Sequence, residues 1–219
     1  MDKRQQNRHN KMTNWEKDRL NLEAIGVGTF DDFPPILFEW LNNNISDKFK
    51  ANDTLAGHIK NEYYYKNPPN ELVDYIVKKS QEHFKLKYYS DTISVLTSNA
   101  PFVLKSLWVN LQKKYEFNPL HDHSGIFSFI IPLKIPYKLE DENKALPHNP
   151  ERNPFTSRLV FVTTNNVGRI IDTPVNMDES FIGKCMIFPA ELKHMVYPFF
   201  TSDDYRITVS GNIALKVNK

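Results

Sequence analysis

Cysteine is almost absent from this chain of 219 residues, which contains one. A single cysteine excludes a disulfide bond within the chain, and the sequence therefore fits a reducing compartment. Cys185 lies in the strand-like run 183–188. We expect a buried thiol at this position and not a reactive one.

Long apolar runs are also missing. No stretch approaches the ~20 residues that a membrane helix requires. The N-terminal residues MDKRQQNRHNKM contain no apolar core of the kind that a secretory signal has. We therefore expect no membrane partner and a cytoplasmic location.

Neither sign of charge is in large excess, since the formal net charge at pH 7 is +2. The chain has no overall basic field, so we do not expect a nucleic-acid partner. Basic residues near the N-terminus leave that option open. Hydrophobic residues make up 40% of the chain, which is enough for a substantial core. The length fits one domain with an elaborated edge, or one domain with a small helical lobe.

The pattern along the chain predicts three regions. Residues 1–24 are polar and basic with little periodicity, and we expect a flexible arm. Residues 25–100 form a helical lead-in packed on the rest, with helices predicted over 31–43 and 69–84. Residues 101–219 then form a β core.

Short segments rich in Val, Ile, Phe, Tyr and Thr fill the third region, and Asn, Gly, Pro and Asp separate them. Seven or eight such strands after a helical lead-in predict a mainly β fold, a double-sheet jelly roll or cupin-like barrel. The longest interruption, 137–156, is polar and is a candidate lid or a mobile surface loop. The predicted strands are 104–115, 126–136, 158–163, 168–172, 183–188, 195–199 and 206–217.

Three of the seven histidines fall next to strand-like runs. His121 and His123 have the i, i+2 spacing that directs two side chains to one side of a strand. His194 follows a later run and could complete one face of a metal site, for which Fe, Cu, Ni or Zn is suited. Asp122 would face the opposite side in a regular strand, whereas in a loop it becomes a rival ligand.

Arg206 begins a run in which polar and apolar side chains alternate. Arg206, Thr208, Ser210 and Asn212 share one face of this predicted strand. That face either meets solvent or lines a polar cavity. In a cavity, the arginine offers a charged fork for a carboxylate, and the threonine adds a hydroxyl donor.

The order of these motifs resembles the 2-oxoglutarate/Fe(II)-dependent oxygenases, in particular an H-x-H subgroup of bacteria and bacteriophages. The resemblance covers about half of the chain, residues 105–217. The motifs that carry it are Trp108-Val109-Asn110, Asn118-Pro119-Leu120-His121-Asp122-His123-Ser124-Gly125, Ser128, Arg158-Leu159-Val160-Phe161, the run 183–189, His194 and the run 206–212.

The resemblance implies a double-stranded β-helix in which His121, His123 and His194 hold Fe(II). It assigns Arg206 to the distal carboxylate of 2-oxoglutarate and Thr208 to the hydroxyl beside it. The implied reaction consumes O2 and 2-oxoglutarate, releases succinate and CO2, and most often hydroxylates the substrate. Most of the wider superfamily has Asp or Glu where this chain has His123, which leaves the metal and the reaction outcome open.

Further polar residues near the motifs are candidates for orienting 2-oxoglutarate. These are Asn110, Tyr115, Asn118 and Ser128. Trp108 is expected in the core.

Two other functions compete with the oxygenase. One is a three-histidine cupin-type dioxygenase that does not use 2-oxoglutarate. The other is a non-catalytic jelly-roll protein, such as a phage structural or assembly component, whose histidines bind nothing or Zn. If a phage encodes the chain, its location is the host cytoplasm. The primary substrate and the oligomeric state stay open, a homodimer among the options.

Overall fold

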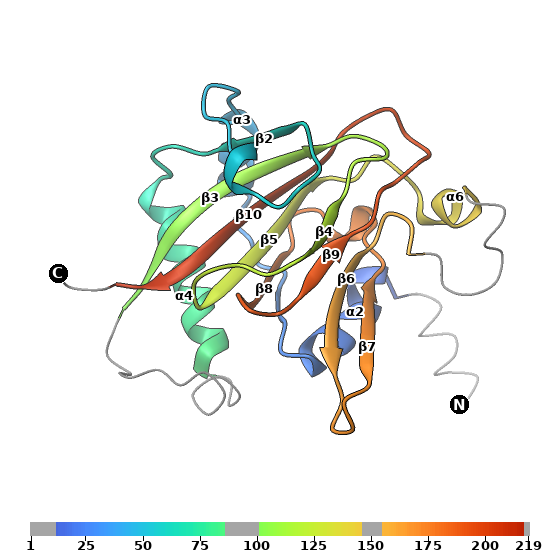
Figure 1. The fold of residues 1–219 in the computed structure, drawn as a ribbon. Helices are drawn as coiled ribbons and strands as arrows, with labels where there is room; N and C mark the ends of the chain where they lie inside the picture. The colour runs from blue at the N-terminus through green and yellow to red at the C-terminus, as the bar shows by residue number, and fades with distance from the viewer. Residues whose placement is uncertain (1–11, 86–100, 146–154, 217–219) are drawn as a thin grey trace.

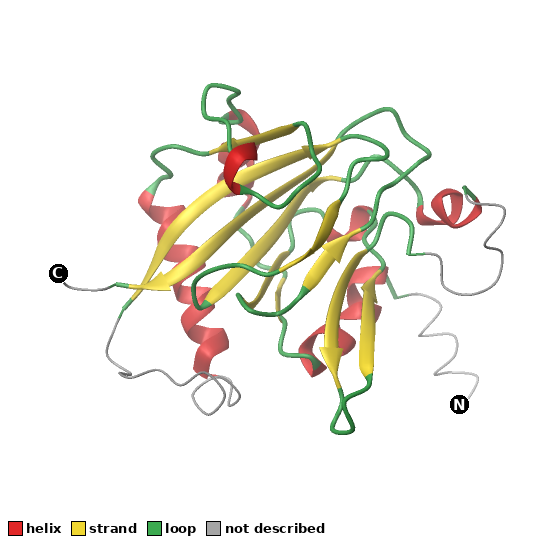
Figure 2. Ribbon diagram, viewed as in Figure 1, coloured by secondary structure: helices red, strands yellow, loops and turns green. Residues whose placement is uncertain are grey.

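The computed structural model describes residues 12–85, 101–145 and 155–216. This described part is mainly β, with three of its four α-helices before the first long strand (Figures 1 and 2). The helices are α2 (Asn14–Ala24), α3 (Pro35–Asn43), η1 (Asn52–Thr54), α4 (Asn70–Lys85), α6 (Leu139–Lys144) and η2 (Glu179–Phe181). The strands are β1 (Gly28–Phe30), β2 (Asn61–Tyr64), β3 (Phe102–Gln112), β4 (Asn118–His121), β5 (Phe127–Lys134), β6 (Leu159–Thr164), β7 (Ile170–Val175), β8 (Cys185–Pro189), β9 (His194–Val196) and β10 (Arg206–Leu215).

The strands form two antiparallel sheets. The larger has the order β1-β8-β5-β10-β3-β2, and the smaller has the order β4-β9-β6-β7. Residues of both sheets line one cavity between them, and the long strands β3, β10 and β5 run through the middle of the larger sheet (Figure 1). This arrangement is the double-stranded β-helix, or jelly roll, that the sequence predicts.

Helices α3 and α4 cover the outer face of the larger sheet. Alternate residues of β5, which include Phe127, Phe129 and Ile131, lie in this core with Leu37 and Ile76 of the helices. All residues of β5 except the last, Lys134, are buried, because both faces of the strand are covered. This explains its almost continuous apolar sequence. The cysteine belongs to the same core at the start of β8, as expected for a buried thiol.

A second core lies between the sheets and beneath α2. Trp15 and Leu22 of this helix are 3% and 1% exposed, and Trp15 packs edge-on against Phe181. The prediction of a flexible arm over 1–24 is therefore wrong for residues 14–24, while residues 1–11 lie outside the described part. The apolar pattern is broken because Asp18, on the buried side of α2, binds the Asn176 backbone and side-chain amides.

The lead-in helices begin close to where the sequence places them. Helix α4 starts at Asn70, but α3 starts at Pro35 and not at 31, because two prolines favour the first turn. Within the interruption 137–156, residues 139–144 form the short helix α6. The lid hypothesis depends on residues 146–154, which lie outside the described chain.

Strand β10 has one apolar face toward the helices and one polar face toward the smaller sheet. Val209 lies in the helix-covered core, whereas Arg206, Thr208 and Ser210 line a cavity between the sheets. The fourth residue of the predicted polar face, Asn212, instead accepts a hydrogen bond from Ser128. The polar face is thus a cavity wall and not a solvent-exposed surface.

Cross-strand pairing arranges the cavity floor in rows. Arg206 pairs with Gln112, and Thr208 pairs with Asn110, which also pairs with Glu62 of β2. Side chains paired in this way stand about 4.5–5.5 Å apart at their Cβ atoms. The lead-in therefore contributes to the floor of the site through β2.

None of the helices in the described part of the chain is both long and apolar enough to cross a membrane.

Candidate metal centre

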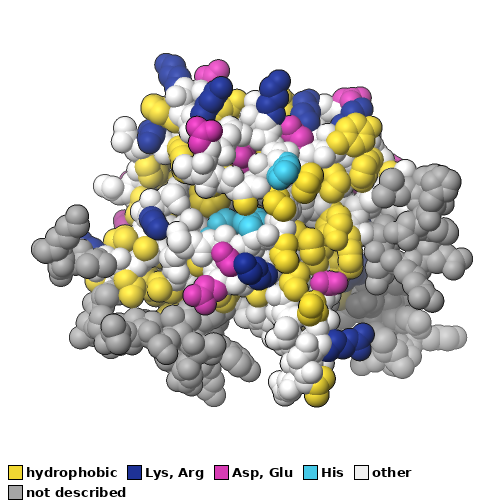
Figure 3. Space-filling model, in the orientation of Figure 1, with side chains coloured by type: hydrophobic (Ala, Val, Ile, Leu, Met, Phe, Trp, Pro, Cys, Tyr) yellow, Lys and Arg dark blue, Asp and Glu magenta, His cyan; other side chains and the backbone are white. Residues whose placement is uncertain are grey.

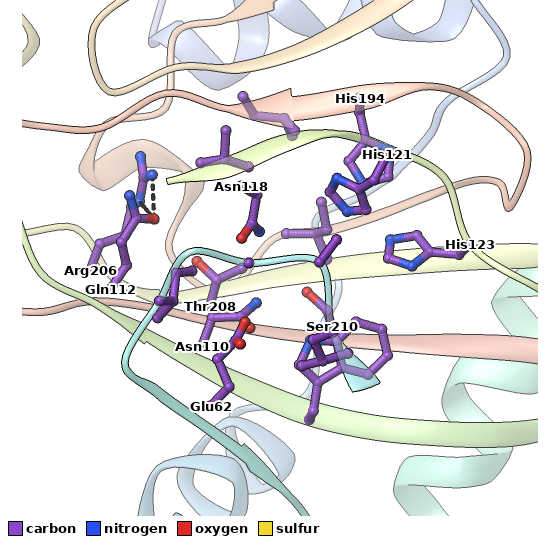
Figure 4. Close-up of a pocket in the computed structure, with 18 of the residues that line it drawn as sticks. Glu62, Asn110, Gln112, Asn118, His121, His123, His194, Arg206, Thr208 and Ser210 are labelled. Carbon is purple, nitrogen blue, oxygen red and sulfur yellow. Dashed lines mark hydrogen bonds between the residues drawn. The ribbon is translucent and has the colours of Figure 1, made fainter. Parts of the chain in front are cut away.

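Three histidines converge at one end of the cavity (Figure 4). His121 ends β4 and pairs with His194 at the start of β9, while His123 lies in the loop just after β4. One nitrogen from each ring lies within 4.8 Å of the others. In the space-filling view, histidine side chains are visible in a hollow at the centre of one face (Figure 3). The sequence spacing brings these three rings together although only one of the H-x-H pair is in a strand.

Backbone carbonyl groups fix the orientation of two of the rings. Nδ1 of His121 lies 2.7 Å from the Pro119 carbonyl oxygen, and Nδ1 of His194 lies 2.9 Å from that of Leu192. A carbonyl only accepts, so each Nδ1 carries the proton and each Nε2 keeps a lone pair for a metal. His123 is held by its backbone amide, which donates to the Ala190 carbonyl, and by ring contact with Trp108.

The cluster keeps its rings uncharged. Burial, followed by repulsion from His121, lowers the pKa of His123 to about 4 and that of His194 to about 3. Burial also lowers the pKa of His121. Because metals bind the neutral imidazole, protons do not compete for this site at neutral pH. The donor set fits Fe(II), Zn or Cu and is a poor match for Mg or Ca.

Asp122 lies outside the cluster. Its carboxylate forms an ion pair of 2.5 Å with Lys193, and its side chain is 45% exposed. Although the segment is a loop beyond His121, the aspartate still points away from the two histidines that flank it. The three imidazoles add no charge, so a divalent ion here keeps its full positive charge.

Arg206 lies at the opposite end of the cavity and is 2% exposed (Figure 4). All five of its N–H groups donate to neutral acceptors. Gln112 Oε1 accepts from Nε at 3.1 Å and from Nη2 at 2.5 Å, and the other acceptors are Tyr137 Oη and the carbonyls of Ser157 and Tyr197. No carboxylate among the described residues pairs with it. A buried cation without an anion is a strong attractor for a carboxylate ligand.

The candidates between the two ends divide into two groups. Thr208, Asn110 and Asn118 line the cavity, and the side-chain oxygens of both asparagines are buried without a hydrogen-bond partner. Ser128 does not line the cavity, since its hydroxyl donates to Asn212. Tyr115 is 61% exposed in a turn and also does not reach it.

Two polar residues of the cavity, Gln112 and Glu62, are not among the residues predicted from the sequence. Glu62 is 1% exposed and is the one acidic residue among the described residues that line the cavity. Burial, followed by repulsion from Glu116, raises the pKa of Glu62 from about 4.5 to about 7. A lone acidic residue in the aromatic strand Asn61–Tyr64 was the one feature of the sequence that pointed to it.

Replacement of Glu62 should change the pH dependence of stability. Between pH 4.5 and 7 the folded protein binds more protons at Glu62 than the unfolded chain does, so stability falls as the pH rises through this range. Glu62→Gln should therefore raise the free energy of unfolding by up to about 3 kcal/mol at pH 8 and by little at pH 5. Urea unfolding of the metal-free protein measures both values, and an equal difference at the two pH values would contradict the prediction.

Jelly roll, histidine cluster and buried arginine together define a non-haem metal oxygenase. The family model described as "Putative 2OG-Fe(II) oxygenase" matches residues 106–212. This segment runs from β3 into β10 and includes the three histidines and Arg206. The chain belongs to the 2-oxoglutarate/Fe(II)-dependent oxygenases. It is an oxidoreductase of the dioxygenase type, with Fe(II), 2-oxoglutarate and O2 as cofactor and co-substrates.

Solved structures share the fold at low sequence identity. A 2OG-Fe(II) oxygenase family oxidoreductase from Burkholderia pseudomallei has a TM-score of 0.51 and 10% identity, over 91% of this chain and 89% of that one. A prolyl-4-hydroxylase from Pseudomonas putida has a TM-score of 0.53 and 12% identity, over 93% of this chain and 100% of that one. IDO from Bacillus thuringiensis has a TM-score of 0.51 and 12% identity, over 94% and 98%. No curated protein sequence matches the chain.

Proposed function

We propose that this oxygenase hydroxylates a C–H bond of its primary substrate and releases succinate and CO2. In this proposal His121, His123 and His194 hold Fe(II), and Arg206 binds the distal carboxylate of 2-oxoglutarate. The observation that carries it is the placement of a neutral three-histidine cluster and an unpaired buried arginine at opposite ends of one cavity.

Bound iron and 2-oxoglutarate supply the oxidising chemistry: one oxygen atom of O2 enters succinate, and the other enters the substrate C–H bond as a hydroxyl group. The protein's own side chains bind and orient. The carbonyls of Pro119 and Leu192 hold two imidazoles with Nε2 toward the cavity. Apolar side chains, among them Ile130, Leu159 and Val196, line the same cavity and restrict the access of water.

The end of the cavity at Arg206 can bind a carboxylate if the carboxylate replaces one present acceptor, the side-chain oxygen of Gln112. Gln112 Oε1 accepts two of the five N–H bonds of Arg206, on adjacent nitrogens that form a fork. A carboxylate that replaces this amide oxygen keeps both bonds and adds the missing negative charge. Thr208 stands next to this end and its hydroxyl bonds to no described residue, so it is free to donate to the same ligand.

An anaerobic titration with Fe(II) and 2-oxoglutarate tests the proposal. We expect a weak visible charge-transfer band that appears only when both ligands are present. Under O2, added 2-oxoglutarate should then be converted to succinate in an iron-dependent manner. Iron binding without the band, together with O2 uptake that does not depend on 2-oxoglutarate, would support a three-histidine dioxygenase instead. Tightly held Zn with no Fe(II) binding would contradict both oxygenase functions.

A further inference from the structure

The cavity holds one anion without a cation, in addition to one cation without an anion. Glu62 and Arg206 do not pair with each other, and no lysine or arginine of the described residues pairs with Glu62. A single hydrogen bond reaches the Glu62 carboxylate, from Asn52 Nδ2 at 3.3 Å. Burial of a carboxylate with so few donors costs free energy unless a ligand supplies the rest.

Two neutral oxygens lie close to this carboxylate. Asn110 pairs with Glu62 across β2 and β3, is 8% exposed, and has an unbonded Oδ1. Asn118 approaches from β4 of the opposite sheet, also with an unbonded Oδ1 (Figure 4). Each of the three residues therefore has an acceptor oxygen in this part of the cavity, and the two amide oxygens accept no hydrogen bond.

Gly57 shows how closely these oxygens converge. A Cβ at this position would lie 2.5 Å from Asn118 Oδ1 and 2.5 Å from Glu62 Oε1. One small volume is therefore bordered by a carboxylate oxygen from one sheet and an amide oxygen from the other. Because glycine carries no side chain, its backbone can approach both oxygens this closely.

We infer that Glu62, Asn110 and Asn118 bind a primary ammonium group of the substrate. An ammonium group has three N–H donors and one positive charge, which matches three acceptor oxygens and one carboxylate. The inference rests on the proposed function, in which Arg206 takes the anionic co-substrate. Glu62 then binds a cationic substrate in the same way, through opposite charge. Each of the two charged residues of the cavity thus has its own ligand.

Calorimetric titration with n-butylammonium chloride tests the inference, with 1-butanol as the uncharged probe of similar size. The full chain is used anaerobically at pH 8 and constant ionic strength, both with Fe(II) and 2-oxoglutarate and without them. We expect butylammonium to bind at least about tenfold more tightly than butanol. Glu62→Gln should weaken butylammonium binding at least about tenfold and leave butanol binding unchanged.

Asp53→Asn is the matched control, because Asp53 carries the same charge in the adjacent segment but is exposed. It should bind butylammonium as the unaltered protein does. Equal affinity for butylammonium in the protein and in Glu62→Gln would overturn the inference, as would equal affinity of the protein for both probes. The charge-transfer band reports separately on the iron and 2-oxoglutarate sites. If the band is absent but the iron-free protein still binds the amine, the proposed function is contradicted and the ammonium site is still supported.

Discussion

Arg206→Met should raise the Kd of 2-oxoglutarate at least about 30-fold and leave the Kd of Fe(II) nearly unchanged. The arginine is 2% exposed and has no carboxylate partner among the described residues. Loss of one member of a buried, hydrogen-bonded charge pair costs roughly 2–5 kcal/mol of binding free energy. The histidines lie at the other end of the cavity, so iron should bind as before. Anaerobic titrations of each ligand, followed by the visible band, give the two constants.

Stability and binding can be separated with a second buried arginine. Arg158 is 7% exposed and donates to Asn176 and to the Thr156 carbonyl, away from the cavity lining. Arg158→Met should lower stability as the Arg206 variant does, because both remove buried hydrogen bonds. It should not change the Kd of 2-oxoglutarate. Equal loss of iron and 2-oxoglutarate affinity in Arg206→Met would contradict the role assigned to Arg206.

His194→Ala should abolish the charge-transfer band and weaken Fe(II) binding at least about 100-fold. Loss of a hydrogen-bond partner of a metal ligand already costs about 10–100-fold in affinity, and loss of the ligand itself should cost more. His194 is 3% exposed and its ring is oriented by the Leu192 carbonyl, so its replacement removes one of three nitrogens that already converge. Equilibrium dialysis against Fe(II) measures the affinity directly.

His83→Ala provides the control for the loss of a buried imidazole. His83 is 5% exposed, bonds to the Gly26 carbonyl oxygen and does not line the cavity. Its replacement should destabilise the protein and leave Fe(II) binding intact. Undiminished iron binding in His194→Ala would mean that the metal uses a different ligand set.

Period-two patterns account for most of what the sequence predicted correctly. The alternation of β10 and the apolar run of β5 predicted the positions of these strands, and the i, i+2 spacing predicted that His121 and His123 lie on one side. Such alternation is local, because successive side chains in a strand point to opposite faces. The same alternation predicted that Arg206 and Thr208 share one face of a strand. It did not decide whether that face is exposed to solvent or lines a cavity.

Helix α2 shows why a local pattern can fail. Its buried side contains Trp15 and Leu22 but also Asp18, whose carboxylate is satisfied by Asn176 from a distant segment. A buried polar residue with a tertiary partner looks, in the sequence, like a solvent-exposed one. The helix is stabilised by packing and not by an apolar stripe of its own.

By itself the sequence predicted the jelly-roll class, the three histidines and the arginine, because residue types, short-range spacing and the order of the motifs along the chain indicate them. Only the tertiary structure decided which polar side chains share the cavity. It placed Asn118 there and left out Ser128 and Tyr115. It also added Glu62, because β2 pairs with β3 across a long stretch of sequence. Pairing between distant strands determines these neighbours, and no local period encodes it.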